Sequence, residues 1–204
     1  MKIRIMTHED ERKWDDYVTS CTLSSAYHQT GWKRVIEKTF GHKTYYLLSE
    51  DKCLKVNGIF PLVQLKSFLF GNFLVSMPYF NYGGICASEA EVYNLLLEEA
   101  IHVARALNVD HIELREDRPV DVSLPCKSSK VGMRLELPAA ADVLWKSFSS
   151  NLRNKVKRPQ RDGMFAKIGR LEELNSFYDV FSKISWKSFQ SRLGSVRSIR
   201  MLSR

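Results

Sequence analysis

The chain has few of the features that mark a disulfide-bonded or metal-binding protein. Its 204 residues include only four cysteines, at positions 21, 53, 86 and 126. Zinc sites and dithiol redox motifs bring two close thiols to one centre, and no two of these cysteines are close in sequence. We therefore expect no metal, and reduced, half-buried core cysteines rather than disulfides, as in a cytoplasmic protein.

Long apolar runs and catalytic motifs are also lacking. Residues 1–13 contain no apolar stretch of the length of a secretory signal. The most apolar segment, residues 68–80, is interrupted by polar residues and a proline and is shorter than the roughly 20 residues that span a bilayer. The sequence contains no G-x-S-x-G, P-loop, H-E-x-x-H or G-x-G-x-x-G motif, so no catalytic residue is assigned from a motif.

Acidic residues are scarce toward the C-terminus, and this explains the formal net charge of +8. Residues 146–170 carry eight basic residues and one acid, and residues 183–204 carry six basic residues and no acid. Residues 1–145 are in consequence slightly acidic, with a net charge of −2. A basic cluster is usually a solvated helix face, but eight cations against one acid fit a phosphate or RNA backbone equally well.

Hydrophobic periodicity predicts a mixed α/β (α+β) fold. We expect strands at residues 3–5, 44–48, 54–66, 73–77, 111–115, 131–137 and 164–168, and helices at residues 10–21, 32–40, 90–107, 139–158 and 171–181. Thr7 and Asp10 form a capping-box pattern before the first helix, and Pro159 is expected to end the helix before it. Two helices after the first strand, then three strands and a long helix, match the layout of a GNAT-type acyltransferase.

Two segments contain candidate binding residues. In residues 81–84, Asn81 and Tyr82 could orient a polar ligand while Gly83 and Gly84 allow close backbone approach, or the glycines simply form a turn at positive φ. Residues 27–32 have two interpretations. Either His28 takes a direct part in the function, or the segment only starts a helix that places Trp32 in the core. The R/Q-x-x-G-x-G/A loop usual in acetyl-CoA acyltransferases does not precede residue 90, which weakens a stand-alone acetyl-CoA enzyme.

Four segments together resemble the FemAB-related proteins, most closely the subgroup found beside exosortase and exopolysaccharide genes. They are residues 27–48, 58–84, 111–115 and 152–159 with Gly163, and the resemblance extends over residues 1–182. It implies a GNAT-like fold, with a mainly antiparallel sheet flanked by helices, and transfer of an acyl or aminoacyl group to an amine. His111 or Glu113 would accept the amine proton, unless both are simply the solvent side of a strand.

The resemblance also implies substrates and sites. The donor would be acyl-CoA or aminoacyl-tRNA, with no bound cofactor, and the acceptor a small or muropeptide-like amine of cell-envelope, peptidoglycan or exopolysaccharide metabolism. The implied substrate-binding residues are Lys66, Asn81, Tyr82, Gly83 and Gly84, and the implied anion- or phosphate-binding residues are Arg153, Lys155, Lys157 and Arg158.

The chain departs from the family in its domain organisation, because the family places two GNAT-like domains in tandem. We expect residues 1–170 to form the first domain, residues 171–182 to start a second domain that is missing, and residues 183–204 to be a basic, Ser/Arg-rich tail. A frameshift accounts for that tail; an amphipathic helix with peripheral membrane contact is the rival hypothesis. The functional alternatives are a non-catalytic remnant, an anion- or RNA-binding module, and a stand-alone acyl-CoA N-acyltransferase.

Overall fold

The computed structural model describes residues 1–69, 71–120, 124–127 and 132–186. The chain divides into two units, Met1–Met133 and Arg134–Arg204, which we describe separately. The predicted domain boundaries at residues 170 and 182 stay a prediction. Among the described residues, no helix has the length and apolar character needed to cross a membrane.

A single sheet organises the unit Met1–Met133. Its strands are β1 (Lys2–Ile5), β2 (Lys43–Glu50), β3 (Val56–Ser67), β4 (Gly71–Ser76), β5 (Cys86–Ala87) and β6 (His111–Glu113). They lie in the order β1-β2-β3-β4-β6, and β5 also pairs with β3. All pairings are antiparallel except that of β4 with β6, which is parallel. The expected mainly antiparallel sheet is therefore confirmed.

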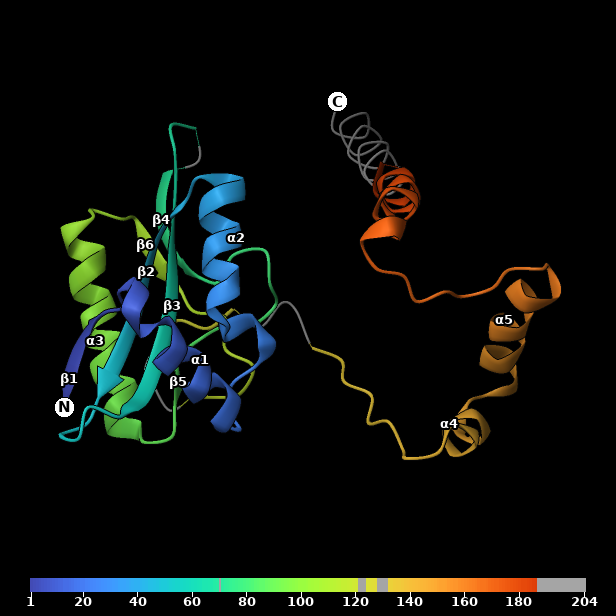
Figure 1. Cartoon of the computed structure of the whole chain (residues 1–204), viewed down its shortest axis with the longest axis horizontal. Helices are drawn as coiled ribbons and strands as arrows, with labels where there is room; N and C mark the ends of the chain where they lie inside the picture. Colours follow the sequence, from blue (N-terminus) through green and yellow to red (C-terminus); the bar gives the residue numbers. More distant parts are fainter. Residues whose placement is uncertain (70, 121–123, 128–131, 187–204) are drawn as a thin grey trace, which may run out of the picture. The chain divides into compact units, whose positions relative to one another are not determined.

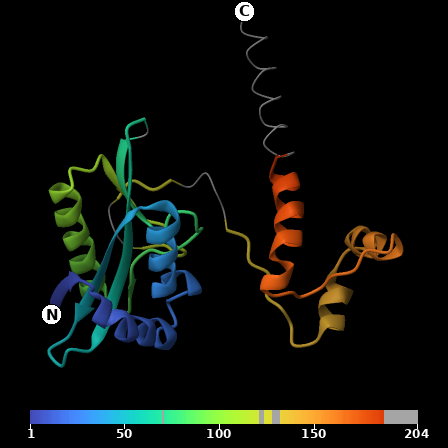
Figure 2. The ribbon, with the colours of Figure 1, turned by 45° about the horizontal axis from the view of Figure 1, so that its top comes forward.

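Helices cover both faces of this sheet, as Figures 1 and 2 show. They are η1 (His8–Asp10), α1 (Glu11–Ser20), η2 (Ala26–His28), α2 (Thr30–Phe40) and α3 (Ala90–Ala106). One apolar cluster joins α1 and α2 to the sheet, and a second joins α3 to its other face. The element order over residues 1–113 is the expected one except for the two-residue β5, which was not predicted. The mixed α/β prediction is confirmed.

The side chains of β2 contribute to the apolar clusters on both faces of the sheet. Tyr46 and Leu48 belong to the cluster with α1 and α2, whereas Leu47 between them belongs to the cluster with α3. Successive side chains of a strand point to opposite faces, so a strand between two helix layers carries apolar residues on both faces. The helix ends also follow the sequence, since Thr7 and Asp10 form the predicted capping box and Gly41 ends α2 at φ 67°.

The parallel strands β4 and β6 pair over three residues only, from Phe73 opposite His111 to Val75 opposite Glu113. After β4 the chain forms a loop over residues 77–85. It then rejoins the sheet in strand β5, which pairs with β3. The returning segment is held by Gly83, whose N–H donates to the Arg115 carbonyl at 3.1 Å. The loop is conformationally strained, because Met77 and Tyr79 adopt φ values of 46° and 74° without being glycine.

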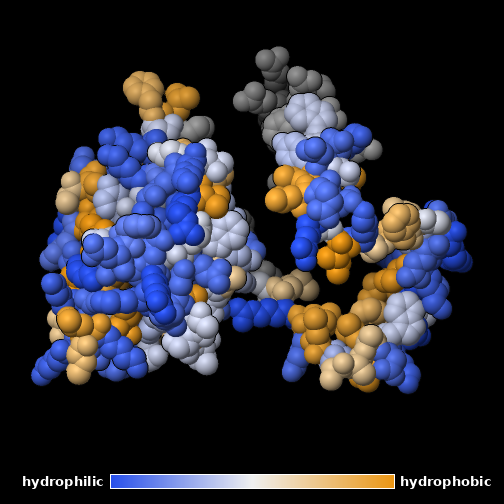
Figure 3. All heavy atoms as spheres, in the orientation of Figure 1, coloured by the Kyte–Doolittle hydropathy of each residue, from blue (hydrophilic) through white to orange (hydrophobic). Residues whose placement is uncertain are grey.

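The described part of the second unit has helices but no core. It comprises α4 (Ala141–Ser147), α5 (Ser150–Arg161), η3 (Leu171–Glu173) and a helix over residues 174–186. No residue among 134–186 is buried. Apolar side chains are therefore exposed on these helices, visible as orange spheres in Figure 3.

Three expectations for this unit are wrong. Of the strand expected at residues 131–137, Val131 lies outside the described residues and 132–137 are not a strand, and neither are residues 164–168. An alternating segment forms a strand only where another strand pairs with it. The single helix expected over residues 139–158 is two helices, since Phe148 interrupts it in an extended conformation. Pro159 lies inside α5 rather than ending it. The proline cannot donate to the Lys155 carbonyl one turn earlier, but the helix continues past it, since Asp162 donates to the Arg158 carbonyl at 3.0 Å.

Candidate functional site

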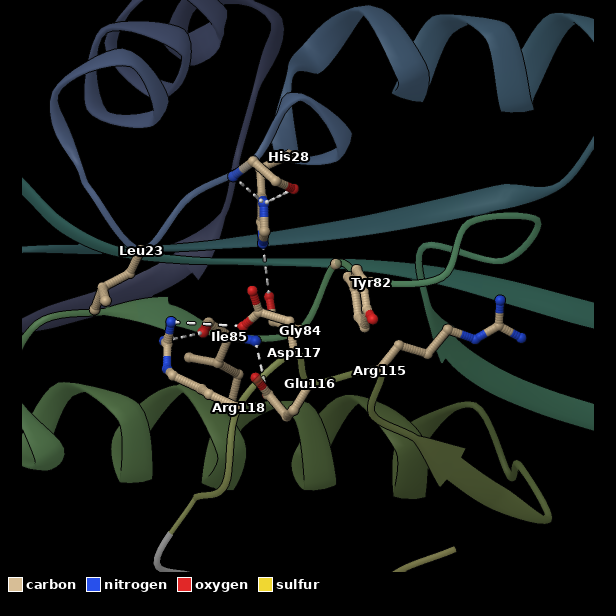
Figure 4. Close-up of a pocket in the computed structure, with 11 residues that line it drawn as sticks. Leu23, His28, Tyr82, Gly84, Ile85, Arg115, Glu116, Asp117 and Arg118 are labelled. Carbon is tan, nitrogen blue, oxygen red and sulfur yellow. Dashed lines mark hydrogen bonds and ion pairs between the residues drawn. The ribbon is translucent and has the colours of Figure 1, made fainter. Parts of the chain in front are cut away.

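A pocket lies at the point where β4 and β6 separate, between the α1–α2 connection, the loop before β5 and the residues after β6 (Figure 4). Its lining residues are Leu23, Ser25, His28, Tyr82, Gly83, Gly84, Ile85, Arg115, Glu116, Asp117 and Arg118. All of them belong to the unit Met1–Met133. The pocket therefore combines three segments that are far apart in the sequence.

His28 fixes one wall of this pocket. Its Nδ1 lies 3.1 Å from the Ser25 backbone nitrogen, which can only donate, so Nδ1 accepts and Nε2 carries the proton. Nε2 then donates to the Gly84 carbonyl at 3.1 Å, as Figure 4 shows. Burial lowers the pKa of His28, which keeps the ring neutral. With both ring nitrogens bonded to the backbone, His28 is a positioning residue, and this agrees with the structural rather than the direct role considered from the sequence.

Trp14 and Trp32 flank the same connection. The Trp14 indole is fully buried and donates from Nε1 to the His28 carbonyl at 2.6 Å. Trp32 is only half-buried and packs against Phe80, with ring centroids 4.6 Å apart. The helix start expected at residues 27–32 is confirmed, but Trp14 contributes more to the core than Trp32 does.

Glu116 supplies a half-buried titratable group in the opposite wall. Its Oε1 accepts hydrogen bonds from the Ile85 N–H at 3.0 Å and from the Tyr93 hydroxyl at 3.1 Å. Burial raises the pKa of this carboxyl above its ordinary value, because removal from water disfavours the charged form. Gly84 makes this position available, since a Cβ there would lie 2.3 Å from Oε1.

Glu116 was not among the residues singled out from the sequence. It stands in an irregular segment after β6, and its environment comes from Ile85 and Tyr93, which are distant in sequence. The residues considered instead, His111 and Glu113, are exposed on β6. Glu113 accepts a hydrogen bond from the Arg115 guanidinium at 2.7 Å. Both residues therefore fit the alternative interpretation, in which they lie on the solvent side of a strand.

Two arginines stiffen the pocket rather than projecting into it. Arg115 points away from His28 and Glu116 in Figure 4 and donates to the Phe80 carbonyl at 2.7 Å. Arg118 donates to the Ile85 carbonyl at 3.4 Å and lies 3.8 Å from the Asp117 carboxylate. Both guanidinium groups therefore hold the loop that precedes β5.

The candidate substrate residues fall in different places. Tyr82, Gly83 and Gly84 line the pocket, while Asn81 is exposed beside it. The Tyr82 hydroxyl packs against Gly132, where a Cβ would come within 2.1 Å of the oxygen. Lys66 is exposed near the far end of β3, where it lines an open depression with Asn72 and Asp110. The structure therefore brings three of these five residues together.

The candidate anion-binding residues lie on α5 in the second unit. Lys155, Lys157 and Arg158 are exposed, and Arg153 is half-exposed. The Lys157 ammonium lies 5.6 Å from the centroid of the Trp145 ring, and Arg158 lies 4.0 Å from the Asp162 carboxylate. Within the described ranges, no group of three or more His, Cys, Asp or Glu residues is arranged to hold a metal ion.

Comparisons with known proteins add structural likeness alone. No protein-family model and no curated protein sequence matches the chain. Among solved structures, glucosamine-6-phosphate N-acetyltransferase from Arabidopsis thaliana is 15% identical, with a TM-score of 0.45 over 66% of this chain and 98% of its own. The aminoglycoside 6'-N-acetyltransferase AAC(6')-IG from Acinetobacter haemolyticus is 12% identical, with a TM-score of 0.43 over 68% of this chain and 100% of its own.

FemX is also similar in structure. It is 19% identical, with a TM-score of 0.41 over 53% of this chain and 25% of the FemX chain. Identities and scores at this level assign neither a donor nor an acceptor to the chain.

Proposed function

We propose that the chain is an acyl- or aminoacyltransferase of the FemAB-related, GNAT-like class, which transfers an activated acyl or aminoacyl group to an amine. The observation that carries the proposal is the half-buried carboxyl of Glu116, which lines the pocket after β6 and has a raised pKa. An amine attacks a carbonyl only in its unprotonated form, so the reaction requires a proton acceptor. A carboxyl whose pKa is raised toward neutral pH serves better as that acceptor than an ordinary surface carboxyl.

The reaction assigns a role to each part of the pocket. The amine nitrogen forms a bond to the donor's carbonyl carbon, and the amine proton passes to Glu116. The C–S or C–O bond to the donor's carrier then breaks, and the carrier takes up that proton and leaves as a thiol or an alcohol. Oε1 already accepts two hydrogen bonds, so we assign the proton to Oε2. Holding the two reactants together supplies much of the rate.

The finer parts of the proposal rest on the sequence resemblance. The donor is acyl-CoA or aminoacyl-tRNA and the acceptor a small-molecule or muropeptide-like amine. The setting is cytoplasmic synthesis of cell-envelope, peptidoglycan or exopolysaccharide material. Transfer of this kind needs no resident cofactor, because the activated carbonyl arrives with the donor.

The experiment measures transfer by the full chain from acyl-CoA and from aminoacyl-tRNA to amino sugars and muropeptide precursors. Glu116→Gln should lower kcat by about 10²- to 10⁴-fold, the usual contribution of a general base. Its melting temperature should stay close to that of the unmodified chain, because the amide oxygen can still accept from Ile85 and Tyr93. Glu113→Gln, on the exposed face of β6, is the matched control and should leave kcat unchanged.

The pH profile separates a proton acceptor from a merely structural carboxyl. The activity of the unmodified chain should fall as pH falls through the pKa of Glu116, which lies above the ordinary carboxyl value of 4.5. Glu116→Gln should lose this acid limb. Absence of turnover from both donors would contradict the proposal and favour a non-catalytic remnant.

The basic face of α5 favours a second candidate function, binding of a phosphate or RNA backbone. Within Ser150–Arg161 the charged residues are all cations: Arg153, Lys155, Lys157, Arg158 and Arg161. If four of them contact phosphates, affinity for tRNA should fall roughly 100-fold between 50 and 200 mM salt, because bound counterions are released. Affinity that does not change with salt would contradict this function.

A further inference from the structure

Two cysteine sulfur atoms lie close together in the unit Met1–Met133. Cys21 directly follows α1 and Cys86 begins β5, and their Sγ atoms lie 3.3 Å apart. Cys86 is fully buried, whereas Cys21 is half-buried. A disulfide requires a sulfur–sulfur distance of about 2.05 Å, so the two sulfur atoms need to approach each other by about 1 Å to form the bond.

Backbone hydrogen bonds hold both cysteines in place. The Cys21 N–H donates to the Tyr17 carbonyl at 2.9 Å and so continues the last turn of α1. The Tyr17 hydroxyl lies 3.1 Å from the Asn57 carbonyl oxygen and 3.2 Å from that of Cys86, which ties α1 to β3 and β5. The short distance between the sulfur atoms is therefore a consequence of how α1 packs on the sheet.

The two thiols have different reactivity. Burial raises the pKa of Cys86, and the neighbouring Cys21 sulfur raises it further. Burial acts in the same sense on Cys21, but hydrogen bonds from the Leu23 backbone and from Cys86 outweigh it and lower the pKa of Cys21. The more accessible sulfur is thus the better thiolate, and an enclosed thiol stands beside it. A sensor cysteine and its resolving partner have this asymmetry.

We propose that Cys21 and Cys86 form a reversible oxidation site, at which a peroxide converts the two thiols into one intramolecular disulfide. The Cys21 thiolate attacks one peroxide oxygen, the O–O bond breaks, and a sulfenic acid forms. The other oxygen leaves as hydroxide and becomes water by taking up the proton that Cys21 released on ionising. Cys86 then attacks the Cys21 sulfur, the S–O bond breaks, and the hydroxyl leaves with the Cys86 proton as a second water. A dithiol reverses the reaction.

The bond would connect two walls of the pocket. Leu23, two residues after Cys21, and Ile85, immediately before Cys86, both line it. Ile85 also donates to Glu116. Oxidation would therefore fix the α1–α2 connection to the segment that holds the Glu116 carboxylate. The oxidation itself does not depend on the proposed transferase activity, so the two proposals can fail separately.

The test uses the full chain carrying Cys53→Ser and Cys126→Ser, which removes the two exposed cysteines and leaves the pair. The protein is treated with a small excess of hydrogen peroxide, alkylated in denaturant, and measured by intact mass and peptide mapping. We expect a monomer that loses both free thiols and the mass of two hydrogens, and regains them with dithiothreitol. Sulfinic acid on Cys21 with Cys86 still a thiol, or cross-links between chains, would overturn the proposal.

Three further variants serve as controls. In the same background, Cys86→Ala should leave Cys21 to proceed to sulfenic and sulfinic acid, and Cys21→Ser should leave Cys86 unmodified because it is buried. The complementary chain carries Cys21→Ser and Cys86→Ser with Cys53 and Cys126 retained, and it should form no intramolecular disulfide. Equal disulfide formation in that chain would contradict the assigned site. Should Cys86→Ala fail to fold, Cys21→Ser alone still tests the pairing.

Discussion

The two units of the chain use apolar side chains in opposite ways. In Met1–Met133, Trp14, Phe60 and Leu96 are fully enclosed between the sheet and its helices. Among residues 134–186, helices of comparable length bury no residue, and Phe177 and Phe181 remain more than half exposed. Most of the stability of a helix in a protein comes from packing of its apolar face, so an amphipathic pattern alone does not provide a core. What distinguishes the first unit is the sheet against which its helices pack.

The largest effect should come from truncating a core aromatic residue of the first unit. Trp14→Ala removes a fully buried ring and leaves the His28 carbonyl without its indole donor. We expect a loss of about 3–5 kcal/mol in the free energy of unfolding, measured by urea titration. Phe177→Ala, the matched change in the second unit, should alter it by less than about 0.5 kcal/mol. Similar losses for both variants would contradict the contrast between the units.

A smaller effect should come from the ion pairs. Arg4 pairs with Asp10 at 2.6 Å and with Glu50 at 3.2 Å, and both carboxylates are nearly buried. Arg4→Met leaves these charges without their partner and should cost about 2 kcal/mol at pH 7, less than for a fully buried pair because Arg4 is partly exposed. Lys146→Met, which removes the exposed pair with Asp142, should cost less than about 0.5 kcal/mol.

Acid should reduce the cost of Arg4→Met. The pKa of Asp10 lies below its ordinary value of 3.8, chiefly because Arg4 donates a hydrogen bond to its carboxylate. The pair therefore stabilises the folded chain above pH 3.8, and this contribution disappears as pH falls through the lower pKa of the folded state. The difference in unfolding free energy between the unmodified chain and Arg4→Met should shrink from pH 7 to pH 3. A constant difference would mean that Asp10 is not the group involved.

The smallest effect should follow removal of the second unit. Both apolar clusters of the first unit consist of residues before position 121. A chain that ends at Met133 should therefore melt within about 2 °C of the full chain when followed by circular dichroism. A decrease of more than about 5 °C would show that the core of the first unit depends on residues after Met133.

Local patterns were sufficient to predict the longer helices and strands of the first unit, but not the two-residue β5. The apolar spacing over residues 90–107 predicts α3, and Thr7 with Asp10 predicts the start of the first helices. The same reasoning failed at residues 132–137, although Met133, Leu135 and Leu137 alternate correctly. Alternation is a property of the segment, whereas a strand also requires a partner that the segment does not specify.

The candidate site was only partly predictable for the same reason. Gly83 and Gly84 are visible in the sequence because a pair of glycines indicates close backbone approach. Glu116 is not visible in this way, because the groups that donate to its carboxylate, in Ile85 and Tyr93, lie 31 and 23 residues earlier in the sequence. The Cys21–Cys86 pair is equally hidden, since a spacing of 65 residues carries no motif.

The short outer strands of the first unit bear on how the protein would aggregate. In the described part of the sheet the edges are β1, with four residues, and β6, with three, while the twelve-residue β3 is paired on both sides. Short edge strands offer few unpaired backbone groups to a neighbouring molecule, so growth by strand addition is disfavoured. Self-association of this chain should therefore occur through the exposed apolar helix faces of residues 134–186. Charged substitutions at Phe177 and Phe181 should improve solubility more than any change along β1 or β6.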